Sequence, residues 1–179
     1  MVFRRKPKEE RPVEAAPSEL SGFVAPTGPT PPTAAEGALF CELGMHQLWY
    51  LERRLKEELA RASRVNSIFS LACWRLRMLP GESMSDELAL KAAELISGRL
   101  RSYDICARID EERFAAILFD AEAAAVTTVA FRIKADLQVE VRSAGRWQAG
   151  VSTFPMDGLD GDGLIQAAFR RLEEDARAA

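Results

Sequence analysis

Residues 101–114 read Arg-Ser-Tyr-Asp-Ile-Cys-Ala-Arg-Ile-Asp-Glu-Glu-Arg-Phe, and this stretch decides the fold of the chain. Residues 103–109 are rich in aromatic and β-branched side chains, and residues 114–119 are an almost unbroken apolar run. The charged segment 110–113 lies between them. Two apolar segments joined by a short polar segment predict a β-hairpin. The polar segment contains neither Gly nor Asn, so local chemistry does not specify the turn type.

The rest of the chain is predicted to form an α/β domain around this hairpin. Helical periodicity of apolar residues predicts four helices, at 43–64, 86–100, 121–137 and 163–176. Alternation and β-branched composition predict further strands at 68–78, 139–142 and 147–153. Ser85 stands directly before Asp86 and Glu87, which is typical of a helix N-cap followed by acidic residues. In the strand 68–78, Arg75 and Arg77 are expected on the face opposite the apolar side chains.

The first 37 residues differ in composition from the rest. Residues 1–37 are rich in Pro, Ala, Glu and Thr, and such a segment buries too little apolar surface to offset its ordering entropy. We therefore expect a disordered tail at 1–37 and a folded domain at 38–179. The tail is either a solvated leader or a docking peptide for a partner protein, with Phe23 and Val24 as anchors.

Composition excludes several classes of function. The 179 residues carry a formal net charge of −3, which gives no reason to expect nucleic acid as a partner. No apolar run reaches the ~20 residues that a membrane span needs, and no apolar segment follows the basic N-terminus as in a secretory signal. Cys41, Cys73 and Cys106 lack metal-binding spacing and are expected as buried free thiols of a cytoplasmic protein. His46 is the only histidine, which excludes His-rich metal sites.

The spacing around the hairpin resembles that of GGDEF domains, the diguanylate cyclase family. Members carry Arg-x-x-Asp, three residues, Arg, one residue, and then Gly-Gly-(Asp/Glu)-Glu-Phe. This chain has Arg101, Asp104 and Arg108 at the same spacing. The five signature positions hold Asp110, Glu111, Glu112, Arg113 and Phe114. The similarity extends over residues 41–176, and it implies a three-layer α/β sandwich with a central, mostly antiparallel five-stranded sheet flanked by helices, similar to nucleotidyl cyclases.

The resemblance also implies where catalysis would fail. In the family, the paired glycines let the backbone approach the GTP phosphates, and an Asp at the end of the first strand holds Mg²⁺. Arg75 and Arg77 stand at that strand end, and a guanidinium offers no oxygen ligand. The segment 79–84 is too short for the guanine-reading helix, and Ala176 replaces a phosphate-binding Lys. We therefore expect no catalytic residue, no metal, no cofactor and no enzyme activity. The alternative is that these charged residues only form salt bridges with one another, for example Arg75 or Arg77 with Glu111 or Glu112.

A second family site keeps all of its residue types. Many GGDEF proteins bind cyclic di-GMP through Arg-x-x-Asp and an Arg on the following helix, here Arg101, Asp104 and Arg132. Arginine forks suit phosphate and the guanine edge, and a carboxylate accepts from guanine N–H groups. The alternative is that Arg101 and Asp104 only cap the helix end and pair with each other.

Two functions follow from this reading. One is a cyclic di-GMP receptor that passes the signal to an unidentified protein partner, with a homodimer bridged by ligand. The other is a nucleotide-independent interaction scaffold.

Overall fold

The computed structural model describes residues 39–141 and 145–178. Within them the elements follow the chain as α1 (Leu48–Val65), β1 (Phe69–Arg77), α2 (Asp86–Arg99), β2 (Ile105–Arg108), β3 (Arg113–Phe119), α3 (Ala123–Glu140), β4 (Arg146–Phe154) and α4 (Gly161–Ala178). The predicted hairpin at 101–114 is confirmed as β2 and β3. Ser85 caps α2 as predicted, because its hydroxyl accepts a hydrogen bond from Leu88 N at 3.3 Å.

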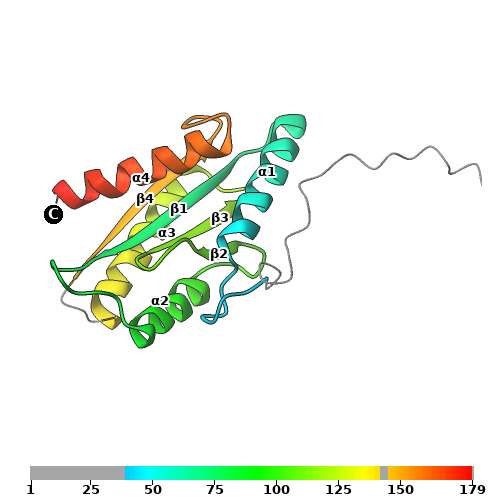
Figure 1. The fold of residues 1–179 in the computed structure, drawn as a ribbon. Helices are drawn as coiled ribbons and strands as arrows, with labels where there is room; N and C mark the ends of the chain where they lie inside the picture. The colour runs from blue at the N-terminus through cyan, green and yellow to red at the C-terminus, as the bar shows by residue number, and fades with distance from the viewer. Residues whose placement is uncertain (1–38, 142–144, 179) are drawn as a thin grey trace, which may run out of the picture. The chain divides into compact units, whose positions relative to one another are not determined.

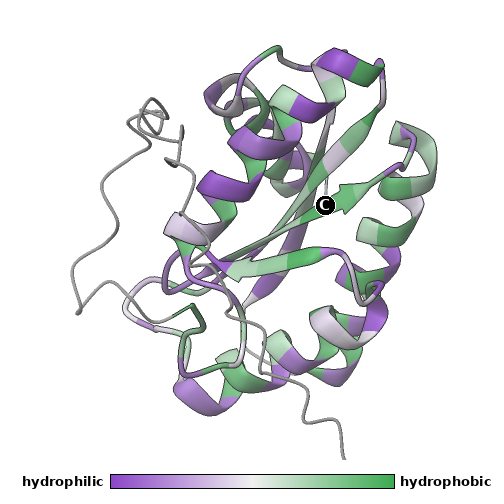
Figure 2. Cartoon of the chain, turned by 90° about the vertical axis from the view of Figure 1, so that its right-hand side faces the viewer, coloured by the Kyte–Doolittle hydropathy of each residue, from purple (hydrophilic) through white to green (hydrophobic). Residues whose placement is uncertain are grey.

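The four described strands form one antiparallel sheet in the order β2-β3-β1-β4. Helices α1 and α4 cover one face, and α2 and α3 cover the other, which gives the predicted three-layer α/β sandwich (Figure 1). Figure 2 shows mostly green strands between helices whose purple residues face outward. The pattern reflects the amphipathic periodicity that predicted the helices.

Each face of the sheet has its own apolar cluster. The cluster under α2 and α3 contains two fully buried tryptophans, Trp74 of β1 and Trp147 of β4. Phe114 of β3 is buried in the same cluster. Trp74 Nε1 donates to the carbonyl of Ala130 at 3.0 Å, so its one polar atom is satisfied on α3. The cluster under α1 and α4 is built on Leu51, Leu55, Phe69, Ile117 and Leu164. Phe114, the last signature residue, is therefore a core residue.

Two expectations about the elements were wrong. No strand forms at 139–142: Val139 and Glu140 end α3, Val141 is its C-cap, and residue 142 lies outside the described part. The described sheet consequently has four strands where five were expected. Helix α1 begins at Leu48 and not at residue 43, because Phe40 and His46 pair with each other and His46 also bridges to Ala107.

Both edges of the sheet are covered. At β2, His46 N donates to Cys106 O at 3.0 Å, and Arg108 N donates to His46 O at 3.2 Å. At β4, three outward backbone amides donate to side chains: Trp147 N to Gln138 Oε1 (2.9 Å), Ala149 N to Asp175 Oδ2 (3.0 Å) and Thr153 N to Asp157 Oδ2 (2.8 Å). The carbonyl of Val151 accepts from the Arg171 guanidinium. Covered edges do not invite pairing with further strands.

The predicted tail, 1–37, lies outside the described residues. Among the residues that are described, no helix is both long enough and apolar enough to cross a membrane.

Candidate functional site

The turn between β2 and β3 is organised by the carboxylate of Asp110. Its Oδ1 accepts hydrogen bonds from Glu112 N and Arg113 N, both at 2.9 Å, and its Oδ2 accepts from Arg113 Nε at 2.6 Å. Burial by itself would raise the pKa of Asp110, but the Arg113 guanidinium and the turn amides outweigh it, so the pKa lies below its ordinary value. The turn contains no Gly or Asn, and the hydrogen bonds of the Asp110 side chain fix its conformation instead.

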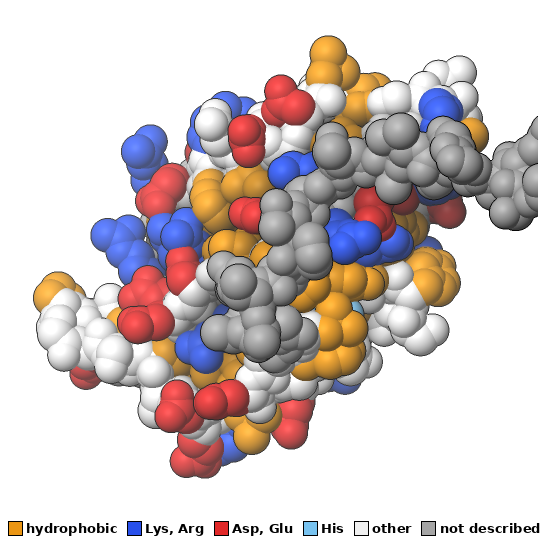
Figure 3. Space-filling model, turned by 45° about the vertical axis from the view of Figure 1, so that its right-hand side comes forward, with side chains coloured by type: hydrophobic (Ala, Val, Ile, Leu, Met, Phe, Trp, Pro, Cys, Tyr) orange, Lys and Arg blue, Asp and Glu red, His pale blue; other side chains and the backbone are white. Residues whose placement is uncertain are grey.

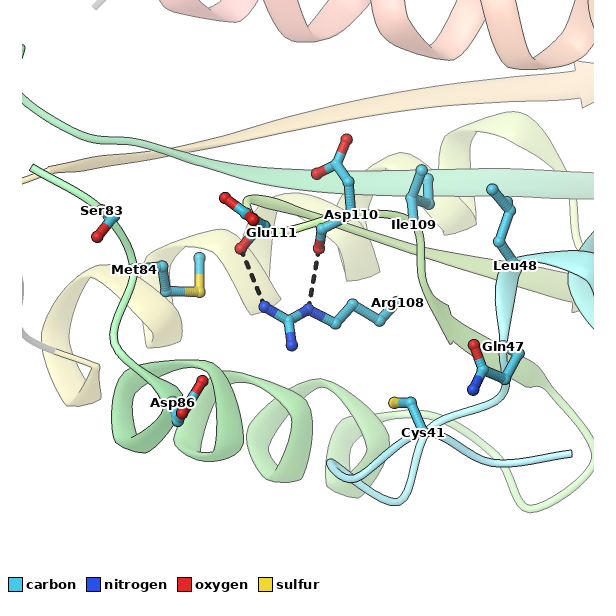
Figure 4. Close-up of a pocket in the computed structure, with 10 residues that line it drawn as sticks. All are labelled: Cys41, Gln47, Leu48, Ser83, Met84, Asp86, Arg108, Ile109, Asp110 and Glu111. Carbon is cyan, nitrogen blue, oxygen red and sulfur yellow. Dashed lines mark hydrogen bonds between the residues drawn. The ribbon is translucent and has the colours of Figure 1, made fainter. Parts of the chain in front are cut away.

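Arg108 supports the same turn from the other side. Its Nε donates to the carbonyl of Asp110 at 2.9 Å, and its Nη2 lies 3.4 Å from the carbonyl of Glu111, as the dashed lines in Figure 4 show. Backbone that would approach a phosphate closely in a glycine-rich turn is here held by guanidinium groups and carries two acidic side chains.

A cavity of about 580 Å³ opens beside this turn. Residues from four parts of the chain line it: Cys41, Gln47, Leu48, Ser83, Met84, Asp86, Arg108, Ile109, Asp110 and Glu111 (Figure 4). Three of these side chains are acidic and one, Arg108, is basic and already bonded to the turn. The electrostatic balance of the cavity therefore opposes a polyphosphate.

The end of β1 carries two arginines, Arg75 and Arg77. Arg75 Nε donates to Gln148 Oε1 at 2.7 Å, and its Nη1 pairs with Glu173 Oε1 of α4 at 2.6 Å. The alternative pairing of Arg75 with Glu111 or Glu112 does not form, because Arg75 pairs with Glu173. Arg77 is exposed on the same face. Within the described residues, no group of three or more His, Cys, Asp or Glu is gathered closely enough to hold a metal ion. The residues at this strand end do not fit GTP with Mg²⁺.

The second candidate site lies where α2 ends and β2 begins. Asp104 is buried, and its Oδ2 accepts a hydrogen bond from Arg101 N at 3.0 Å. Oδ1 is buried as well and accepts no hydrogen bond of ordinary geometry. Burial raises the pKa of Asp104, while the amides of Arg101 and Phe119 and the Arg101 charge oppose that rise. Asp104 therefore contacts the backbone of Arg101 and not its guanidinium.

The guanidinium of Arg101 points to a residue that sequence reasoning missed. Arg101 Nη1 donates to the hydroxyl of Tyr103 at 2.8 Å, and Cζ lies 5.7 Å from the Tyr103 ring centroid. Both side chains are exposed. The signal was present in the sequence, because Tyr103 stands inside the Arg-x-x-Asp motif.

Arg132 is exposed on α3 and has no hydrogen bond or ion pair with another described residue. It stands one helical turn before Asp136, and Asp136 Oδ2 accepts from Arg99 Nε at 2.8 Å. Arg99 lies two residues before Arg101. The structure thus joins Arg101 and Asp104 directly, and it relates Arg132 to them through the contact of α2 with α3.

The profile of the family described as "Diguanylate cyclase, GGDEF domain" matches residues 47–178. No curated protein matches the chain at a significant level.

Solved structures share the fold. The GGDEF domain of FimX from Pseudomonas aeruginosa superposes with a TM-score of 0.70 at 16% identity, over 79% of this chain and 96% of that one. The GGDEF domain of DgcB from Caulobacter crescentus, solved in complex with c-di-GMP, gives 0.69 at 18% identity, over 79% and 92%. The diguanylate cyclase SiaD of Pseudomonas aeruginosa, solved with its activator SiaC, gives 0.67 at 21% identity, over 81% and 60%.

Proposed function

The chain belongs to the diguanylate cyclase GGDEF domain family, and from this premise we propose that it no longer makes cyclic di-GMP but binds it and passes the signal to a partner protein. We take residues 38–179 as the domain and residues 1–37 as a tail available to the partner. Cyclic di-GMP would be held by Arg101, Asp104 and Arg132, and an intercalated ligand pair would bridge two copies.

The loss of catalysis is supported by what occupies the catalytic edge. A cyclase must hold GTP, metal ions and an activated hydroxyl group. Here Arg75 is committed to Gln148 and Glu173, and Arg113 to Asp110. These contacts support the proposal, because a guanidinium that is bonded to protein offers Mg²⁺ no oxygen ligand. Each departure affects a separate requirement, so no single substitution would restore turnover.

One contrast carries the binding proposal. Arg75 and Arg113 are engaged by protein groups, whereas Arg101 uses one donor on Tyr103 and keeps the others for a ligand. Arg132 has no partner among the described residues. Guanidinium groups and a carboxylate are the groups that suit the phosphates and guanine edges of a cyclic dinucleotide.

Isothermal titration calorimetry with cyclic di-GMP and with GTP tests the proposal. We expect the protein to bind the cyclic dinucleotide, and we expect Arg101→Ala to weaken binding by at least about tenfold, since a charged hydrogen bond contributes roughly 1.5–3 kcal/mol. Arg64→Ala is the control, because Arg64 is an exposed arginine on α1, outside the proposed ligand residues and the contact of α2 with α3. Unchanged affinity in the Arg101→Ala protein would remove the site.

One observation favours the second candidate, a nucleotide-independent scaffold. The Asp104 carboxylate already fixes the loop through Arg101 N, which is a structural role that needs no ligand. A flat calorimetric titration of the wild-type protein with cyclic di-GMP would select this candidate.

A further inference from the structure

A group of arginines gathers on the α4 side of the sheet, at the end of β1. Arg77 of β1 and Arg146 of β4 are register partners, so their side chains leave the sheet side by side. Both are exposed. Arg75 emerges on the same face one step back along β1, and Arg177 lies on the neighbouring helix α4. We call Arg75, Arg77, Arg146 and Arg177 the arginine surface.

The arginine surface has one acidic neighbour that the contacts identify, Glu173. Its carboxylate pairs with Arg75 at 2.6 Å. The hydrogen bond from Arg75 lowers the pKa of Glu173, and the charges of Arg77 and Arg177 lower it further, which places all three cations around one carboxylate. Arg77, Arg146 and Arg177 form no ion pair with any described residue. The surface is therefore left with excess positive charge.

This arrangement opposes local stability. Like charges directly opposite each other on neighbouring strands are destabilising. The chain as a whole has more acids than bases, with 27 Asp and Glu against 24 Lys and Arg, so acidic residues are common elsewhere in the sequence. An anion from outside the domain would relieve the repulsion within this cross-strand Arg–Arg pair.

We propose that the arginine surface docks an acidic segment of a partner protein. Guanidinium forks bind carboxylates bidentately, and arginine is enriched at protein interfaces. Neither the cavity at the β2–β3 turn nor the cavity of about 330 Å³ between α2 and α3 includes any of these arginines, which favours an extended segment over a small molecule. Figure 3 shows Lys and Arg side chains interspersed with Asp and Glu side chains over the face that it draws.

The docking step does not depend on cyclic di-GMP. The arginines lie on β1, β4 and α4, whereas the proposed ligand residues lie after α2 and on α3. The two proposals can therefore fail separately, and the experiment is done without any nucleotide.

The test is fluorescence anisotropy of a labelled Glu-rich peptide of about ten residues, titrated with the full chain at low salt. We expect saturable binding that weakens as salt is added, and we expect Arg77→Glu/Arg146→Glu to weaken it by at least about tenfold. Arg64→Glu is the control, since Arg64 is exposed on α1, away from the surface. It should change the affinity by less than about twofold.

A second variant, Arg177→Gln, tests the arginine surface independently, so the proposal can still be judged if the double variant misfolds. It removes a charge from an exposed helical position, so it should fold and weaken binding by about threefold. The proposal is overturned if the wild-type protein does not bind the peptide, if Arg64→Glu weakens binding as much as the double variant, or if Arg177→Gln has no effect. Tighter binding of an equally charged single-stranded DNA would also overturn it, in favour of nucleic acid.

Discussion

The carboxylate of Asp175 in α4 accepts a hydrogen bond from the backbone amide of Ala149 in β4, at 3.0 Å. The same carboxylate receives Lys134 Nζ of α3 at 2.7 and 2.8 Å. One side chain therefore ties together both helical layers and the outer strand of the sheet.

Asp175→Ala should destabilise the domain by about 2–4 kcal/mol, because it leaves a largely buried lysine and a strand amide without partners. Glu174→Ala, at the exposed neighbouring position, should change stability by less than about 0.5 kcal/mol. Urea unfolding measures both. The open edge should also promote self-association, which light scattering detects. Equal stability of the two variants would contradict this account.

Asp157 makes stability depend on pH. The Arg171 hydrogen bonds, at 2.7 and 2.8 Å, lower the pKa of Asp157 in the folded state. A carboxyl group with a lowered folded pKa stabilises the protein above its unfolded pKa of about 4 and loses that contribution as the pH falls through the folded pKa. The stability difference between wild type and Asp157→Asn should be constant at neutral pH and shrink below about pH 4. A difference that grows on acidification would show that the sign is wrong.

Restoring the two glycines should not restore catalysis. Asp110→Gly/Glu111→Gly recreates the glycine pair, but Arg75 remains at the end of β1 and Mg²⁺ still lacks its oxygen ligands. We expect no cyclic di-GMP from GTP and Mg²⁺ by chromatography. We also expect about 1 kcal/mol of destabilisation, since the partly exposed Asp110 no longer bonds the turn. The single variant Glu111→Gly is the control for the backbone effect, and formation of product would refute the prediction.

Tyr103 should position Arg101 for the proposed ligand. Tyr103→Phe keeps the ring and removes only the hydroxyl that accepts from Arg101. We expect a roughly fivefold weaker affinity for cyclic di-GMP, because one ordinary hydrogen bond is lost. Thermal stability should be unchanged. Ser102→Ala, at the neighbouring exposed position, should bind as wild type does. Full affinity in Tyr103→Phe would leave Arg101 independent of Tyr103.

The three thiols should react at different rates. Burial raises the pKa of Cys73 and of Cys106 to about 12. The expectation that all three thiols are buried was wrong for Cys41, which is half-buried and lines the cavity. Because the thiolate is the reactive form, a thiol-specific reagent should modify Cys41 quickly and the other two only after unfolding. Cys41→Ser should abolish the fast phase, and a fast phase that persists would mean that a buried thiol is accessible.

Local patterns were enough to predict most of the fold. The hairpin, the Ser85 cap and the alternation that separates Arg75 from Trp74 depend on neighbouring residues, and the structure confirms them. The strand expected at 139–142 does not form. In the structure, the apolar stripe of α3 continues from Leu137 to the buried Val141 at a helical spacing, so packing decided against strand propensity.

The candidate site was less predictable, because its contacts join distant parts of the chain. Arg75 and Glu173 are 98 residues apart, and alternation told which face Arg75 occupies but not which acid would meet it. The contact of Arg101 with Tyr103 spans two residues and was within reach of sequence reasoning.

The pairing of His46 with β2 determines where a pull on the chain would be felt. His46 is bonded to Cys106 and Arg108, and its ring stacks on Tyr50 with centroids 4.5 Å apart. Strand β2 runs from the Asp104 loop to the Asp110 turn. A displacement of the segment around His46 would therefore load β2 first and strain both loops together, so this edge strand mechanically couples the segment before α1 to the two candidate sites.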